Sequence, residues 1–184
     1  MEKNSVKYGV IAGLISVLYA LLLYFTDQTF NMALGSVSLV ISLYFMWKAC
    51  QDDRTLQGGF ASFREMFSSA FITYAVVTFF AVIFQYVLLT MIDPGLVDIQ
   101  VEKTMEQTAK ILEWGGLEEG SAEYEKALAD AEQEAIPSLK GSLFGYMGAL
   151  IFGALISLIF GAAMKKNKPP HIAVDDETEH LIEK

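Results

Sequence analysis

The sequence predicts an all-α membrane protein, a bundle of four transmembrane helices with an acidic helical hairpin between the third and the fourth. The chain has 184 residues, 53% of them hydrophobic, and a mean hydropathy of +0.39. Its charged residues, 19% of the total, are confined almost wholly to three segments, whereas a soluble domain spreads charge over every amphipathic helix. Four stretches carry no charge at all: residues 8–25, 30–47, 67–92 and 143–164.

These uncharged stretches are long enough to cross a bilayer. They contain 18, 18, 26 and 22 residues. At about 1.5 Å per residue they span about 27 to 39 Å, against a hydrocarbon core of about 30 Å. The linker between the first two is so short that it forces an antiparallel helical pair. No small-residue cleavage pattern follows the first stretch, so we expect a retained helix and no cleaved signal peptide.

The charge distribution predicts the orientation. Twelve of the 22 acidic residues lie between Asp93 and Glu134. Basic residues gather before the first stretch, between the second and third, and after the fourth: Lys3, Lys7, Lys48, Arg54, Arg64, Lys165, Lys166 and Lys168. The positive-inside rule places those segments in the cytoplasm. We therefore expect a multi-pass protein of the bacterial inner (cytoplasmic) membrane with N and C termini in the cytoplasm.

The loop over residues 93–140 is predicted to be an extracytoplasmic helical hairpin. Asp93 and Pro94 signal a helix start. Apolar residues then recur at steps of three and four, and Gly115-Gly116 separates two such runs. Two alternatives stay open for the acidic residues of the hairpin. They form a solvated face, or they bind basic partners or divalent cations.

Residues 1–166 are predicted to form one membrane domain, followed by a tail. Residues 167–184 include two prolines and five acidic residues, a composition typical of a flexible segment. We expect a flexible acidic cytoplasmic tail.

The segment between the second and third stretches is polar at first, turns at a glycine pair and continues with aromatic residues at helical spacing. This pattern predicts a short interfacial helix that leads into the third span. Its aromatic face either anchors the segment at the membrane surface or, together with one acidic residue, binds a partner. The residues concerned are Gly58, Gly59, Phe60, Phe63, Glu65 and Phe67.

The last helix carries a small residue at every fourth position, a stripe that permits close packing of helices in lipid. Two glycines form a similar patch on the first helix. The sequence leaves open whether these contacts lie within the bundle or between chains of a homo-oligomer. The predicted packing residues are Gly9, Gly13, Gly141, Gly145, Ala149, Gly153, Ser157 and Gly161.

We find no pattern that indicates a reaction. The uncharged stretches predict a membrane interior without ionisable groups, which disfavours a charge-coupled transporter. Gln85, Thr78 and Ser42 are the candidates for a polar path. We expect no catalytic residues, no metal and no cofactor, since no nucleophile–base pair, metal-ligand spacing or phosphate loop is present. The net charge of −9 disfavours a nucleic-acid partner.

The chain resembles an uncharacterised bacteroidete membrane family, domain of unknown function 4199. The resemblance rests on the Gly58-Gly59-Phe60 turn with the residues that follow it, on Lys7-Tyr8-Gly9, on the acidic outer loop and on the glycine-rich last helix before Lys165. It covers residues 3–168 and implies the same four-span topology. It also implies a membrane partner, a family-two glycosyltransferase, in envelope glycan or lipid assembly.

Two functions follow as expectations. The first is a non-enzymatic scaffold or accessory subunit of an envelope-related membrane complex, in contact with the lipid bilayer and a protein partner. The alternative is a carrier or flippase-like protein for an uncharged or lipid solute.

Overall fold

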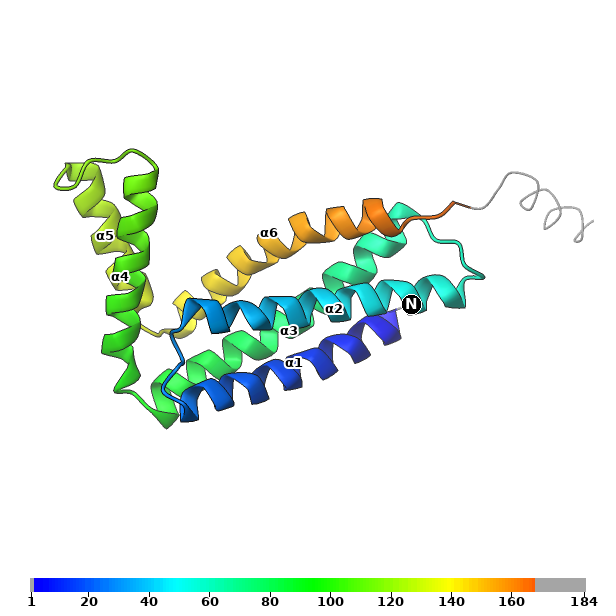
Figure 1. The fold of residues 1–184 in the computed structure, drawn as a ribbon, viewed down its shortest axis with the longest axis horizontal. Helices are drawn as coiled ribbons and strands as arrows, with labels where there is room; N and C mark the ends of the chain where they lie inside the picture. Colours follow the sequence, from blue (N-terminus) through cyan, green and yellow to red (C-terminus); the bar gives the residue numbers. More distant parts are fainter. Residues whose placement is uncertain (1, 168–184) are drawn as a thin grey trace, which may run out of the picture.

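The computed structural model describes residues 2–167, and every regular element in this range is a helix (Figure 1). The helices are α1 (Glu2–Phe25), α2 (Met32–Leu56), α3 (Phe63–Val87), η1 (Leu88–Ile92), α4 (Leu96–Trp114), α5 (Ala122–Ala135) and α6 (Leu139–Met164). η1 is a single π-helical turn that extends α3. Most of the predicted tail, residues 168–184, lies outside the described residues.

Four helices are long and apolar enough to cross a membrane by length and composition. They are Asn4–Phe25, Met32–Leu56, Phe63–Ile92 and Leu139–Met164. The prediction of a helical chain with four long apolar helices is therefore confirmed for the described residues. Each span is as long as the uncharged stretch that predicted it or longer, because polar residues at the ends of the stretches continue the helices.

The four spans form a bundle around α3, which packs against each of the other three, while α6 packs almost entirely on α3 (Figure 1). We call the end of the bundle near Glu2 and Met164 the N-terminal end, and the opposite end, where α4 and α5 lie, the hairpin end. A buried apolar cluster lies at the N-terminal end and comprises Met46, Cys50, Ala61, Met66, Ala70, Tyr74 and Met164.

The connection between α2 and α3 differs from the prediction. α2 continues through the polar residues to Leu56, and α3 begins directly at Phe63, so no separate interfacial helix exists between them. Nothing breaks the helix after Trp47, because the polar side chains of its last turns find partners on α1 and α3. Gly58 and Gly59 then end it with φ angles of +69° and +87°, which glycine adopts readily.

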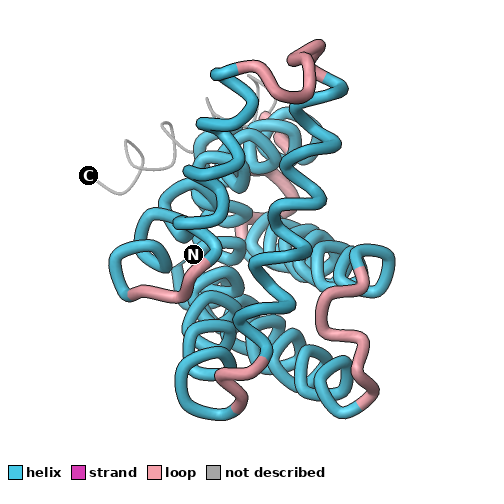
Figure 2. The backbone as a smooth tube through the Cα atoms, turned by 90° about the vertical axis from the view of Figure 1, so that its left-hand side faces the viewer, coloured by secondary structure: helices cyan, strands magenta, loops and turns pink. Residues whose placement is uncertain are grey.

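α4 and α5 pack against each other and stand across the end of the bundle, with their connecting tip projecting beyond it (Figures 1 and 2). One side chain links this hairpin to α3 at its base. The amide of Gln85 donates to Gln100 at 2.9 Å, and the amide of Gln100 donates to the carbonyl of Ala135 at 2.7 Å. α4 itself has no buried residue, so the hairpin is held mainly by its base.

Candidate functional site

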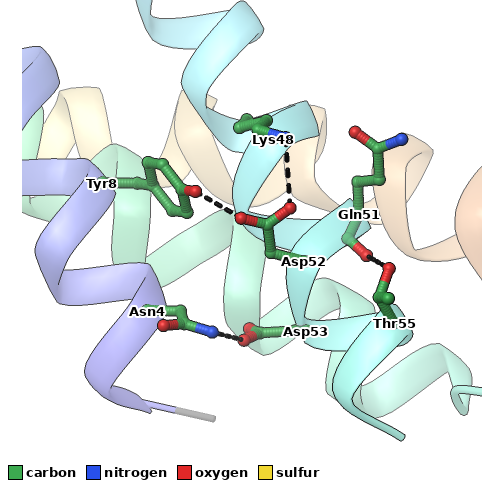
Figure 3. A network of polar contacts seen from close by, with 7 residues as sticks. All are labelled: Asn4, Tyr8, Lys48, Gln51, Asp52, Asp53 and Thr55. Carbon is green, nitrogen blue, oxygen red and sulfur yellow. Dashed lines mark hydrogen bonds and ion pairs between the residues drawn. The ribbon is translucent and has the colours of Figure 1, made fainter. Parts of the chain in front are cut away.

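A buried carboxylate joins three helices at the N-terminal end of the bundle. Asp53, on α2, is 0% exposed. Its two oxygens accept hydrogen bonds from the amide of Asn4 at 3.2 Å (Figure 3) and from the hydroxyls of Ser5 at 3.3 Å and Ser69 at 2.6 Å. A buried charge is costly unless it is hydrogen-bonded or paired, and here neutral donors from α1 and α3 solvate it. We call Asn4, Ser5, Asp53 and Ser69 the Asp53 cluster.

The neighbouring acid on α2 faces a different group. Asp52 accepts a hydrogen bond from the hydroxyl of Tyr8 and forms an ion pair with Lys48 at 3.2 Å (Figure 3). Adjacent side chains on a helix point about 100° apart. Asp52 therefore reaches Tyr8 on the flank of α1, while Asp53 points into the interface of α1, α2 and α3.

The prediction of a membrane interior without ionisable groups rests on the uncharged stretches and stays a prediction, because Asp53 lies six residues beyond the second stretch, near the end of α2. A cleft of about 230 Å³ adjoins Asp53 and is also lined by Arg64 and Glu65. Within residues 2–167 no group of three or more His, Cys, Asp or Glu side chains is placed to hold a metal ion. As arranged, the Asp53 cluster can fix the three helices relative to one another.

The segment for which the sequence leaves both membrane anchoring and partner binding open is engaged with the chain itself. The backbone of Ala61 exchanges two hydrogen bonds of 2.8 Å with that of Lys166, beyond the end of α6, and Lys166 Nζ lies 5.6 Å from the ring centroid of Phe60. Glu65 accepts hydrogen bonds from the backbone amide and the hydroxyl of Ser62 and completes a capping box for α3. Glu65 thus serves as a helix cap here.

The aromatic residues of this segment also face α6. Phe63 and Phe67 stack with ring centroids 6.2 Å apart. A Cβ added at Gly161 would lie 2.9 Å from Phe63 Cε2 and 3.2 Å from Phe67 Cβ. Gly161 therefore allows the two rings to approach α6, although Phe63 keeps 39% of its surface exposed.

The small-residue stripe of α6 divides into two halves. In its second half a Cβ at Gly153 would overlap the ring of Tyr74, and Ser157 is fully buried. In its first half, Gly145 has nothing within 4 Å of the position of a Cβ, and the position at Gly141 meets only the cap residue of its own helix, 2.9 Å away. Ala149, between the halves, is half-buried. The stripe thus packs on α3 in its second half and stays open in its first.

The glycines of α1 also lie against α3. A Cβ at Gly9 would lie 2.7 Å from Val76 Cβ, and one at Gly13 would lie 2.8 Å from Phe80 Cδ2. In lipid, where helices gain little from the hydrophobic effect, such close approach supplies the dispersion that holds them together.

The three residues of the predicted polar path do not come together in the clefts at Gln85. Gln85 lines two clefts, and neither of them includes Thr78 or Ser42. The hydroxyl of Ser42 donates to the carbonyl of Ser38 in its own helix at 3.0 Å. Gln85 binds Gln100 at the base of the hairpin. Hydrogen bonds within the fold therefore account for Gln85 and Ser42.

A large cleft lies at the hairpin end, between α4 and the connection from α1 to α2. We call it the outer cleft; its volume is about 750 Å³. One part of its wall is apolar and aromatic: Tyr24, Phe25, Phe30, Met32, Leu96 and Ile99. Polar residues form the rest of the wall: the charged Asp27, Asp93, Lys103, Glu106 and Lys110, and the neutral Gln28, Thr29, Asn31 and Gln107.

The charged residues on the α4 side of the outer cleft interact with one another. Lys103 and Lys110 each form an ion pair with Glu106, at 2.9 and 2.7 Å. Hydrogen bonds from the two ammonium groups, that from Lys110 first, lower the pKa of Glu106 to about 2, and the bond to Glu106 raises the pKa of Lys103. Glu106 and Lys103 therefore stay charged at neutral pH.

One comparison with known proteins decides the family. A family model described as "Protein of unknown function (DUF4199)" matches residues 7–166. The chain belongs to this family. The matched DUF4199 region covers the four spans and the hairpin together. No curated protein and no solved structure matches the chain.

Sequence reasoning about this DUF4199 protein missed the Asp53 cluster and the outer cleft. A signal for Asp53 existed, because it shares a helical face with Met46, Ala49 and Cys50, all fully buried. For the outer cleft no local signal existed. Its walls come from a loop near residue 27 and a helix more than 65 residues later, and only the fold brings them together.

Proposed function

We propose that this protein is a non-enzymatic accessory subunit of an envelope-related complex in the bacterial inner membrane, with both termini in the cytoplasm and the α4–α5 hairpin outside. The proposed orientation is supported by the basic residues near the N-terminal end of the bundle and the acidic residues in the hairpin. Family membership is compatible with this proposal and assigns no role.

The observation that carries the proposal is the free tip of the hairpin. Trp114, the last residue of α4, is 97% exposed, and Ile111, one turn earlier, is 70% exposed. The tip projects beyond the bundle (Figures 1 and 2). Tryptophan is enriched among the residues that dominate protein interfaces. A protein partner beside the bundle would bury these two side chains, and an envelope glycosyltransferase is the partner class that the sequence resemblance implies.

The test is to extract the full chain from its native membranes in mild detergent, measure the mass of the particle and identify proteins present in stoichiometric amount. We expect a partner that remains with the wild type and is lost at least about tenfold in Trp114→Ala, since hot-spot truncations cost about 2 kcal/mol or more. Ile136→Ala is the matched control, because Ile136 is exposed near the base of the hairpin. A lone monomer or homodimer would contradict the proposal.

A carrier or flippase-like role for an uncharged or lipid solute is the second candidate, and the observation that favours it is the pair of clefts lined by Gln85, of about 180 and 480 Å³. Vesicles that contain the purified protein and a fluorescent lipid or uncharged solute would test it. Transport that is lost in Gln85→Leu while the variant folds normally would favour the carrier. Wild-type transport in that variant would count against the polar path.

A further inference from the structure

The outer cleft lies at the level where the spans end. Phe25 is the last residue of α1 and Met32 the first of α2, and both line the cleft. They remain 79% and 69% exposed. In a bilayer this level is the boundary between acyl chains and headgroups, because the spans match the hydrocarbon thickness. A ligand that fits here has an apolar part next to a polar one.

The charges of the outer cleft indicate which polar part fits. Lys103 and Lys110 supply two positive charges, and Asp27, Asp93 and Glu106 supply three negative ones, which leaves a net charge of −1. An anionic headgroup would meet net repulsion. A headgroup with a positive and a negative group can satisfy both signs, and electrostatic complementarity of this kind gives specificity.

The net charge differs between two parts of the cleft wall. On α4, Lys103 and Lys110 flank Glu106 and pair with it, so this part carries a net charge of +1, whereas Asp27 and Asp93, outside α4, carry −2. At about 1.5 Å per residue, Lys103 and Lys110 lie about 10 and 21 Å along α4 from Leu96. Asp93 also accepts a hydrogen bond of 3.3 Å from Tyr24, whose ring contacts Phe25 at 5.4 Å between centroids. Carboxylates beside aromatic rings suit an ammonium group. The lysine side chains, 43% and 69% exposed, remain accessible to a phosphate.

We propose that the outer cleft binds the headgroup of a zwitterionic phospholipid. The ammonium group faces Asp27, Asp93 and the aromatic wall, and the phosphate faces Lys103 and Lys110. The acyl chains leave the cleft along Phe25 and Met32 into the bilayer. This inference goes beyond the accessory role and needs no protein partner, so either can fail while the other stands.

The experiment measures retention of added lipid on the full-length protein by native mass spectrometry in detergent. The probes are phosphatidylethanolamine, which is zwitterionic, and phosphatidylglycerol, which is anionic, with identical acyl chains. We expect the wild type to bind the zwitterionic lipid at least about tenfold more tightly. Lys103→Gln with Lys110→Gln should remove most of this preference, and Asp93→Asn should weaken binding of the zwitterionic lipid alone.

Matched controls lie on α5, away from the outer cleft: Lys126→Gln and Asp130→Asn should bind as the wild type does. Phe25→Ala is a second test variant in case the charge variants misfold. Phe25 is largely exposed, so its truncation should weaken lipid binding without lowering the melting temperature. Equal retention of the two lipids by the wild type would overturn the proposal. So would unchanged binding in the double lysine variant, or binding of acyl-free glycerophosphoethanolamine as tight as that of the lipid, which would indicate a soluble ligand.

Discussion

Asp53 shows how one residue can determine the contacts of several helices. Its carboxylate accepts hydrogen bonds from two residues of α1 and one of α3, and it is fully buried. The shortest of these bonds comes from Ser69 at 2.6 Å. Because the buried carboxylate cannot form hydrogen bonds with bulk water instead, removal of any one of these donors leaves part of its charge unsolvated.

Ser69→Ala should therefore destabilise the protein by about 1–3 kcal/mol, the cost of leaving a buried polar group unsatisfied. Unfolding in detergent, followed by circular dichroism during denaturant titration, measures this. Ser36→Ala is the control, since Ser36 is exposed on the same bundle and donates only to the carbonyl of Ala33 in its own helix. Equal stability of the two variants would mean that the donor to Asp53 contributes nothing.

The charge state of Glu106 gives a second prediction at this scale. Its pKa of about 2 lies below the usual 4.5, because Lys110 and Lys103 donate to it. A depressed pKa in the folded state stabilises the fold above the ordinary pKa, and this contribution is lost as the pH falls from about 4.5 toward 2. Titration of the carboxyl carbon by NMR should show the low value. Lys103→Gln with Lys110→Gln should return it to about 4.5.

If Glu106 titrated at its ordinary pKa in the wild type, the ion pairs would not persist in solution. Glu106 is well exposed, and surface pairs contribute little stability, so the titration itself is the informative measurement. The control is Lys126→Gln on α5, which removes a lysine that forms no ion pair among the described residues and should leave the low pKa of Glu106 unchanged.

Single residues also mark the limit of sequence-based reasoning. The uncharged stretches revealed the spans because runs of about 20 consecutive apolar residues are rare outside membrane-spanning helices. They did not reveal Asp53, which lies six residues past the end of the second stretch, where a polar residue is ordinarily solvated. Only the continuation of α2 to Leu56 carries Asp53 into the helix interface.

At the scale of helices, the stripe on α6 separates into a packed half and an open half, which the sequence pattern could not distinguish. Small residues at every fourth position predict that a helix can be approached closely. They do not indicate which neighbouring helix makes that approach. The ring of Tyr74 occupies the space above Gly153, whereas the space above Gly145 is empty.

This division yields a matched pair of variants. Gly153→Ala places a methyl group into the ring of Tyr74 and should destabilise the bundle by about 1–3 kcal/mol through overpacking. Gly145→Ala adds a methyl group that has no neighbouring helix of the described residues within 4 Å and should melt at the wild-type temperature or above. Differential scanning fluorimetry in detergent compares them. A destabilised Gly145→Ala with a lower native mass would instead place the first half of the stripe in an interface between chains.

The link between hairpin and bundle is also an element-scale feature. Gln100 joins α3 to α5 by accepting from Gln85 and donating to Ala135. Gln100→Leu removes both bonds, worth about 1–3 kcal/mol together, so local opening of the hairpin should become about tenfold more frequent. Hydrogen exchange measured by mass spectrometry should rise in α4 and α5 and stay unchanged in α1.

Gln133→Leu is the control for that experiment, because Gln133 is exposed on α5 and shares the change in polarity and size. Equal exchange in the two variants would show that the bridge through Gln100 does not hold the hairpin. Such a result would indicate that the hydrogen bond between Tyr24 and Asp93 attaches the hairpin to the bundle instead.

For the whole molecule, four spans require both ends of the bundle domain to lie on the same side of the membrane. The N-terminal end gathers the ends of α1, α2, α3 and α6, and the hairpin occupies the other end (Figure 1). The basic residues cluster near the first and the acidic residues at the second. The positive-inside rule then predicts the absolute orientation, which neither length nor composition of the spans determines.

Labelling of single cysteines tests this orientation directly. Cys50 is the only cysteine of the sequence and is buried, so Cys50→Ala gives a background without thiols. Glu118→Cys places a thiol in the exposed tip of the hairpin, and Leu56→Cys places one at the end of α2, where the side chain is 74% exposed. A membrane-impermeant maleimide applied to spheroplasts should label Glu118→Cys fully and Leu56→Cys only after the membrane is opened. The reverse labelling pattern would indicate the opposite orientation, in which the outer cleft and its proposed lipid lie in the cytoplasmic leaflet.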